Sequence, residues 1–190
     1  MQKLRVEYWQ TIGEVPLADL VFLDEAGVHL AMTRRHARAK KGDRAYGKVP
    51  SNRGKNVTMI GALSVSGLIA PMTWQDGTDG LTFLTYVEQV LAPTLWEGAC
   101  VVMDNFRSHH VDGVQAAIEA VGAKLVYLSP YSPDFSPIEN CWSKLKASLR
   151  AQAARTYDTL NDAISRAIDE ISKQDIIGWF THCCYCSQPN

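Results

Sequence analysis

The sequence has no long hydrophobic run. No stretch approaches the roughly 20 consecutive apolar residues of a transmembrane helix. The first residues, 1–5, lack the apolar core of a secretory signal, and neither repeats nor low-complexity segments occur. These absences exclude a membrane-spanning or repeat protein, and we expect a cytoplasmic location.

Cysteine is scarce and badly placed for a disulfide framework. There are five cysteines, an odd number, and three of them (Cys183, Cys184 and Cys186) fall within the last eight residues. The run from His182 to Cys186 is too tightly spaced for a standard four-ligand zinc site, and no second Cys/His pair accompanies it. We therefore expect the end of the chain to form a packed helix.

Net charge is also nearly absent, but its distribution is uneven. The formal charge of −1 hides a basic segment, residues 34–55, in which nine Lys or Arg residues face a single acid, Asp43. Such a density can neutralise several phosphates of a nucleic acid. A solvated basic loop explains the same pattern, so the charge alone leaves both interpretations open. The basic residues are Arg34, Arg35, Arg38, Lys40, Lys41, Arg44, Lys48, Arg53 and Lys55.

The 190 residues, 46% of them hydrophobic, suit one globular domain. Apolar runs and turn residues predict strands at 20–24, 56–64, 68–74, 99–104 and 124–128. Helical periodicity predicts helices at 79–95, 111–121, 157–172 and 176–186, and a further one that starts at Pro137 with Ser136 as its cap. The order predicts an α/β fold with a mixed five-stranded sheet and helices on both faces. We divide the chain into an N-terminal lead-in, 1–19, of one or two helical turns, and a domain, 20–190.

Three acidic residues stand at informative positions. Asp24 follows the apolar run 20–23, Asp104 follows the run 100–103, and Glu139 opens the helix after a proline-rich segment. Ligands gather at the carboxyl ends of strands in such sheets. Clustered carboxylates repel one another unless a cation joins them, and three of them can hold two Mg²⁺ ions if one bridges. A lone acid at either kind of position is more often a turn cap or a partner of the helix dipole.

Other residues near these acids have open roles. Glu139, Lys146 and Arg150 share one helical face, which is typical of a metal ligand beside a phosphate track or of a plain salt-bridge ladder. His109 lies five residues after Asp104 and could orient water or a phosphate, or be structural. Asp134 sits between two prolines and is interpreted as a turn residue.

The acid motifs resemble those of mariner-like bacterial insertion-sequence transposases, which are DDE superfamily endonucleases. The segment 128–146, with its Pro-Tyr-Ser-Pro and Pro-Ile-Glu elements, is similar to the family's third-acid motif. Segments 22–27 and 102–109 resemble the first and second motifs, and 34 residues separate Asp104 from Glu139, as in that family. The ending 179–183 is also similar, so the resemblance spans roughly residues 20–186 of the chain.

The resemblance implies a ribonuclease-H-like catalytic domain that cleaves DNA at transposon ends and joins the 3′ hydroxyl to target DNA. Asp24, Asp104 and Glu139 would bind two Mg²⁺ ions, with Mn²⁺ as a substitute. The partner would be double-stranded DNA, both transposon ends and target, in a bacterial cytoplasm near the nucleoid. The expected DNA-contact residues are Arg34, Arg35, Arg38, Lys40, Lys41, Arg44, Arg53, Lys55, His109, Lys146 and Arg150.

One departure from the family matters. Its members usually carry an N-terminal helix-turn-helix region that reads the terminal repeats, whereas 19 residues precede the first predicted strand here. The sequence is then one half of a split reading frame, a trimmed sequence or a decayed copy. We expect a helix-turn-helix subunit as a partner in the first case, and a homodimer by analogy. A non-catalytic DNA-binding remnant and a structure-selective nuclease of the same fold are the alternative functions.

Overall fold

The computed structural model describes residues 2–106 and 109–186, so residues 107 and 108 of the second-acid motif lie outside it. Five strands form one sheet in the order β3-β2-β1-β4-β5. Strands β4 and β5 run parallel to β1, whereas β2 runs antiparallel to its neighbours, which confirms the expected mixed sheet. The strands are β1 (Leu20–Val28), β2 (Val57–Ser64), β3 (Gly67–Gln75), β4 (Cys100–Met103) and β5 (Lys124–Tyr127).

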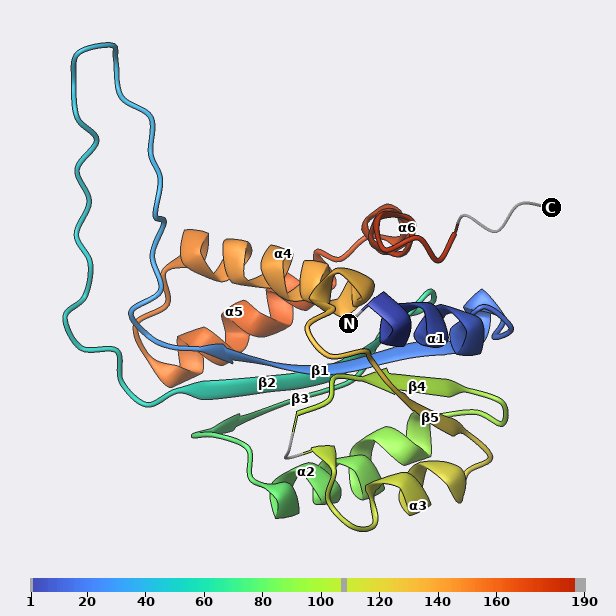
Figure 1. Ribbon diagram of the computed structural model, residues 1–190. Coiled ribbons are helices and arrows are strands. Elements are labelled where there is room, and N and C mark those ends of the chain that lie inside the picture. The colour runs from blue at the N-terminus through green and yellow to red at the C-terminus, as the bar shows by residue number, and fades with distance from the viewer. Residues whose placement is uncertain (1, 107–108, 187–190) are drawn as a thin grey trace.

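Helices cover both faces of this sheet, as expected (Figure 1). Helices α1, α4, α5 and α6 lie on one face, and α2 and α3 lie on the other. In the described part of the chain, no helix is long and apolar enough to cross a membrane. The helices are α1 (Gln2–Ile12), α2 (Gly80–Tyr86), α3 (Val114–Glu119), α4 (Pro137–Gln152), α5 (Tyr157–Asp169) and α6 (Lys173–His182), with the short turns η1 (Leu17–Asp19), η2 (Val87–Leu91), η3 (Ala92–Thr94) and η5 (Pro133–Phe135).

The central strand β1 is buried on both faces, which explains its run of apolar residues without alternation. Phe22 and Ala26 point into the core beneath α4, α5 and α6, whereas Val21 and Leu23 point into the core over α2 and α3. Because side chains alternate along a strand, Asp24 belongs to the α4 face and Glu25 to the other.

Several boundaries differ from the prediction for physical reasons. Strand β1 continues to Val28 instead of ending at 24, because β2 pairs with it in antiparallel register as far as Val28↔Val57. The expected helix 79–95 changes to a π-helical turn after Tyr86 and to a 3₁₀ turn around Pro93. Ser136 occupies the N-cap position of α4, but its side chain forms no capping hydrogen bond. The last helix, α6, begins at Lys173 and ends at His182, earlier than the expected 176–186.

Helix α1 is longer than the one or two turns expected, and it packs into the main core through Tyr8 and Ile12. Its Arg5 binds the carboxylate of Asp134 at 2.6 Å and the hydroxyl of Ser132 at 2.9 Å. The same guanidinium lies 3.8 Å from the ring centre of Phe135. Helix α1 therefore holds the proline-rich loop that leads to α4.

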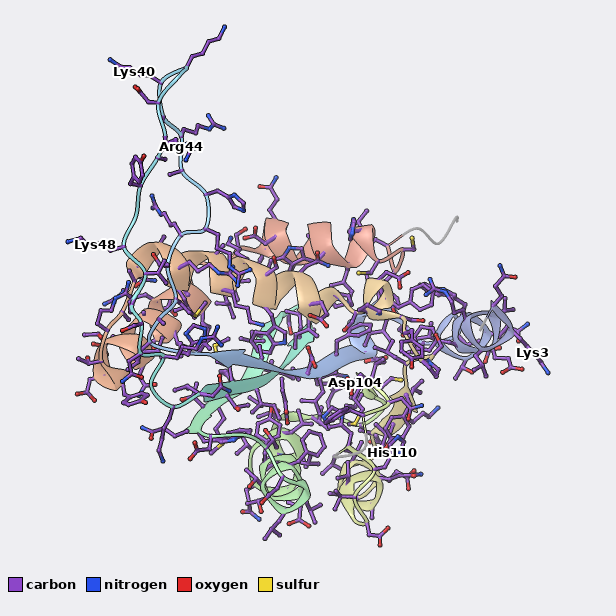
Figure 2. All side chains as sticks on the ribbon, turned by 60° about the vertical axis from the view of Figure 1, so that its left-hand side comes forward. Lys3, Lys40, Arg44, Lys48, Asp104 and His110 are labelled. Atoms are coloured by element: carbon purple, nitrogen blue, oxygen red, sulfur yellow. The ribbon has the colours of Figure 1, made fainter. Side chains whose placement is uncertain are left out.

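The basic segment between β1 and β2 is an extended arm that projects away from the sheet (Figures 1 and 2). Its base is closed by a hydrogen bond from the Leu30 amide to the Arg53 carbonyl, 3.0 Å long. Arg155, two residues before α5, donates to the carbonyls of Leu30 and Met32 at 2.9 and 3.0 Å. Residues 34–49 of the arm are exposed.

Strand β3 forms one edge of the sheet and is irregular there. Its pairing with β2 shifts register between Ile60 and Ala62. Opposite this shift Ala70 has a positive φ of 52°, and Pro71 follows it. The edge strand is therefore bulged near its middle.

A chain of buried hydroxyl groups joins α1 to the C-terminal segment and allows a stability prediction. Tyr185 donates to the Phe135 carbonyl at 2.7 Å, so the 2.6 Å bond between the two tyrosines must be donated by Tyr8. Tyr8→Phe removes one donor and should lower the free energy of unfolding by about 1 kcal/mol. Tyr185→Phe leaves the Tyr8 hydroxyl and the Phe135 carbonyl unpaired and should lower it by about 2–3 kcal/mol. Urea unfolding followed by circular dichroism measures both, and equal losses would contradict this bonding direction.

Candidate active site

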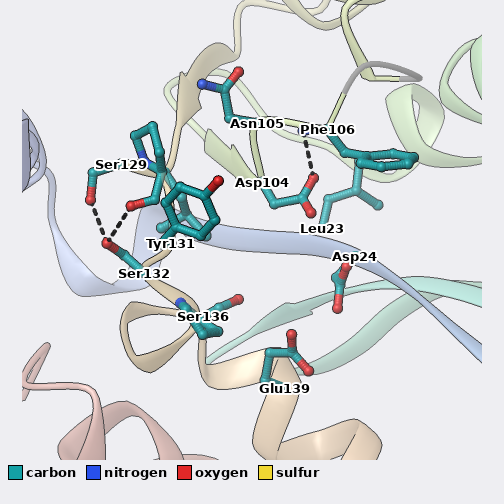
Figure 3. Close-up of a pocket in the computed structure, with 13 residues that line it drawn as sticks. Leu23, Asp24, Asp104, Asn105, Phe106, Ser129, Tyr131, Ser132, Ser136 and Glu139 are labelled. Carbon is teal, nitrogen blue, oxygen red and sulfur yellow. Dashed lines mark hydrogen bonds between the residues drawn. The ribbon is translucent and has the colours of Figure 1, made fainter. Parts of the chain in front are cut away.

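The parallel pairing of β1 with β4 brings the first two acids level with each other. The register pairs Leu23 with Met103, so Asp24 is the next residue on β1 and Asp104 directly follows the end of β4. Alternation directs both to the face that α4 covers. Glu139 lies in the first turn of α4, and all three residues line one cavity of about 430 Å³. Figure 3 shows their carboxylates around this space, with those of Asp24 and Glu139 turned toward each other.

The local sequence explains how Glu139 reaches the cavity. Ser129 and Ser132 share a buried hydrogen bond of 2.7 Å between their hydroxyls, which closes the proline-rich loop. Pro137 then occupies the first turn of α4, where its missing amide costs nothing. Ile138 is fully buried beside Glu139, so the start of α4 is anchored in the core.

The pKa values of Asp24 and Asp104 reflect the burial of these acids and the charges around them. Burial raises the pKa of Asp24 to about 7, and the negative charges of Glu139 and Asp104 act in the same direction. Burial also raises the pKa of Asp104, but the hydrogen bond and charge of His109 outweigh it and hold that pKa below its usual value. The cavity therefore concentrates negative charge that a bound cation would relieve.

Each aspartate is also held by one ring nitrogen, a detail the sequence did not reveal. The indole Nε1 of Trp142 donates to Oδ2 of Asp24 at 3.0 Å. Gly61, the register partner of Asp24, lies beside this ring, since a Cβ there would be in ordinary van der Waals contact with it at 3.6 Å. In the sequence Trp142 belongs to the apolar stripe of its helix. Only its position three residues after Glu139 could have indicated a contact with the acidic site.

His109, an expected DNA contact, is buried beside Asp104. Its side chain is 3% exposed, and Nδ1 lies 2.6 Å from Oδ1 of Asp104. The ring stacks on Phe83 with the centroids 4.4 Å apart. A ring buried in this way is not exposed for contact with a backbone phosphate in this structure, and the DNA-contact role of His109 stays a prediction.

The donor set is compatible with Mg²⁺ or Mn²⁺. Its members are carboxylate oxygens, and Mg²⁺ is commonly held by one or two carboxylates while it keeps several waters. Over residues 2–106 and 109–186, no group of three His, Cys, Asp or Glu side chains is close enough to hold a single ion. The described side chains therefore form no complete three-ligand metal site in this structure, and each ion would be held by fewer than three of these carboxylates.

A second cavity, of about 790 Å³, lies between the base of the arm and α4. None of the described residues that line it is acidic. Burial lowers the pKa of His29 at its wall, and the charges of Arg53, Arg150 and Arg35 lower it further, which indicates a positive potential. Its basic lining residues are Arg34, Arg35, Lys48, Arg53, Lys146 and Arg150.

The structure thus brings five of the eleven expected DNA-contact residues together in this basic cavity. Arg38, Lys40, Lys41 and Arg44 lie instead on the exposed part of the arm, and Figure 2 labels two of them near its tip. Lys55 forms an ion pair with Asp76, with 3.3 Å between Nζ and Oδ2.

Comparison with known proteins places these features in a family. A family model described as DDE superfamily endonuclease matches residues 19–161. The fold is similar to the Mos1 mariner paired-end complex with Mn, at 15% identity and a TM-score of 0.75, over 96% of this chain and 57% of that one. It is also similar to the Mos1 transposase catalytic domain with Raltegravir and Mg, at 13% identity and a TM-score of 0.69, over 98% of this chain and 92% of that one.

These likenesses confirm the expected ribonuclease-H-like fold. The chain spans just over half the length of the Mos1 chains in the paired-end complexes, 57% in the first of them. No curated protein matches the chain significantly. The family match covers about three quarters of the sequence, including Asp24, Asp104 and Glu139. This chain therefore belongs to the DDE superfamily endonucleases.

Proposed function

We propose that this chain is a transposase catalytic domain that cuts DNA at transposon ends and joins the freed 3′ hydroxyl to target DNA. The observation that carries the proposal is the convergence of Asp24, Asp104 and Glu139 on one cavity, where burial first and then the charges of the other two acids raise the pKa of Asp24. The similar Mos1 structures include a paired-end complex with the left transposon end and a strand transfer complex, which supports DNA as the partner.

Two successive reactions follow from this assignment. Water attacks a phosphorus atom at the transposon end, and the bond to the 3′ oxygen breaks to release a 3′ hydroxyl. That hydroxyl then attacks a phosphorus atom of target DNA and displaces a second 3′ oxygen. Asp24 and Asp104 would hold one ion, and Glu139 the second. When bound, the two ions would activate the attacking oxygen and stabilise the leaving one.

The DNA backbone is assigned to the basic cavity and the arm. Lys146 and Arg150 lie seven and eleven residues after Glu139 on α4, about 10 and 16 Å along a helix that rises 1.5 Å per residue. The same rigid element therefore carries an acid of the cleavage site and two phosphate ligands. This arrangement would place the held phosphates a few nucleotides from the scissile one. A helix-turn-helix subunit to read the terminal repeats and a second copy of this chain complete the proposed assembly.

The central test removes a carboxylate without changing its shape. Asp104→Asn and Glu139→Gln should each slow Mg²⁺-dependent nicking of transposon-end duplex at least about 1000-fold, a barrier increase of about 4 kcal/mol. Asp158→Asn, an exposed acid in the first turn of α5, is the control and should nick normally. End-labelled DNA on denaturing gels measures the rate.

Other outcomes of that experiment separate the rival functions. Full activity of Asp104→Asn would refute the assignment. A wild-type protein that binds DNA equally well in chelator and never nicks it would be a DNA-binding remnant. Preferential cleavage of branched DNA or RNA–DNA hybrids over plain duplex would indicate a structure-selective nuclease.

A second prediction concerns the basic cavity. The double substitution Lys146→Ala and Arg150→Ala should weaken DNA binding and reduce the slope of log K against log salt by about 2, since each phosphate contact contributes about 0.9. Lys173→Ala, an exposed lysine at the start of α6, should leave the slope unchanged. Fluorescence anisotropy at several salt concentrations measures the slopes. Equal slopes for the double variant and the wild type would remove the cavity from the DNA path.

A third prediction follows from the raised pKa of Asp24. Because this pKa is about 7 when folded and about 3.9 when unfolded, the folded state binds the proton more tightly. The stabilising contribution of the Asp24 carboxyl is complete below pH 4 and is lost as the pH rises through 7. In chelator, Asp24→Asn should therefore have a higher Tm than the wild type at pH 8, by several degrees, and this gain should fade toward pH 4. Differential scanning calorimetry measures it, and a gain that is independent of pH would contradict the electrostatic explanation.

A further inference from the structure

The carboxylate of Asp104 is held from one side only. Its Oδ1 lies 2.6 Å from Nδ1 of His109 and accepts the Phe106 amide at 3.1 Å. Figure 3 shows the Phe106 bond beside the cavity. In the described part of the chain no donor reaches Oδ2, and the side chain is 51% exposed. One oxygen is thus fixed by the protein while the other is available to the cavity.

The ring that fixes Asp104 is itself immobilised. His109 stacks on Phe83 with an interplanar angle of 26°, and Phe106 packs edge-on against it with centroids 6.1 Å apart. The backbone carbonyl of His109 accepts a hydrogen bond from the Tyr127 hydroxyl at 3.2 Å, which ties the histidine to β5. Its other nitrogen, Nε2, is buried and has no hydrogen-bond partner among the described residues. The ring therefore presents one donor, Nδ1, in one direction.

We propose that His109 is a positioning residue that binds Oδ1 of Asp104 and thereby directs Oδ2 toward a divalent cation in the cavity. The inference rests on the proposed function, because it assigns Asp104 as a cation ligand. Removing a partner that orients a metal ligand in this way typically weakens metal affinity about 10–100-fold. The same arrangement recurs at Asp24, where the buried indole of Trp142 holds Oδ2.

Three substitutions of His109 separate hydrogen bonding from packing. The side-chain amide nitrogen of Asn can take the position of Nδ1, whereas that of Gln reaches the position of Nε2 instead. His109→Asn therefore keeps the donor to Asp104 but loses volume, and His109→Gln keeps more of the volume but loses the donor. His109→Phe keeps a ring that can stack on Phe83 and has no donor. If packing alone mattered, Gln and Phe would be better tolerated than Asn.

The experiment titrates Mn²⁺ into the whole chain without DNA by isothermal calorimetry. The wild type and His109→Asn should bind Mn²⁺ with similar affinity, whereas His109→Gln and His109→Phe should bind it about 10-fold more weakly or worse. The Mn²⁺ concentration that gives half-maximal nicking should rise in the same two variants. Circular dichroism and Tm in chelator report whether each variant is folded.

The outcomes distinguish this inference from the proposed function. Gln or Phe variants that bind Mn²⁺ as tightly as the wild type, or an Asn variant weaker than Gln, would overturn the role of His109 and leave the proposed function intact. A wild-type chain that binds no Mn²⁺ and never nicks would overturn both. If His109→Phe fails to fold, the comparison of Asn with Gln still decides, because both are amides.

Discussion

The site depends on the parallel pairing of β1 with β4 at the centre of the sheet. The register Leu23↔Met103 is what brings Asp24 and Asp104 level on one face. A slip of one residue would move every side chain of β4 to the opposite face, and Asp104 with them. The apolar residues of both strands are buried on both faces of the sheet, so such a slip would also disturb the packing of two cores. The packing that stabilises the fold therefore also fixes the position of the acids.

The third acid depends on a different set of contacts. Glu139 is placed by the docking of α4, whose buried Ile138 and Trp142 flank it along the helix. The loop before it is held by Arg5 of α1, which comes from the other end of the chain. Burial, and after it repulsion from Glu139 and Asp104, raises the pKa of Asp24 to about 7, which is a cost of this geometry. The apolar contacts of α4 and α1 hold the carboxylates together in spite of it.

Much of this arrangement could be predicted from the sequence, because apolar runs and helix signals are local. The run Leu20–Leu23 and the proline at 137 located a strand and a helix start correctly. The extension of β1 beyond Asp24 to Val28 was missed, because Glu25 breaks the apolar pattern and only the pairing with β2 reveals the longer strand. The bond from His109 to Asp104 was also missed, because ring orientation and burial depend on Phe83, a residue distant in sequence.

The bulge in β3 has a consequence for how copies of this protein meet one another. A sheet edge with a straight row of free amides and carbonyls is a template for strand addition and aggregation. The left-handed backbone at Ala70 interrupts that row, and Pro71 has no amide to offer. Edge-to-edge association through β3 is therefore discouraged by the backbone itself. Two copies of this chain brought close together would therefore have to meet through surfaces other than this edge.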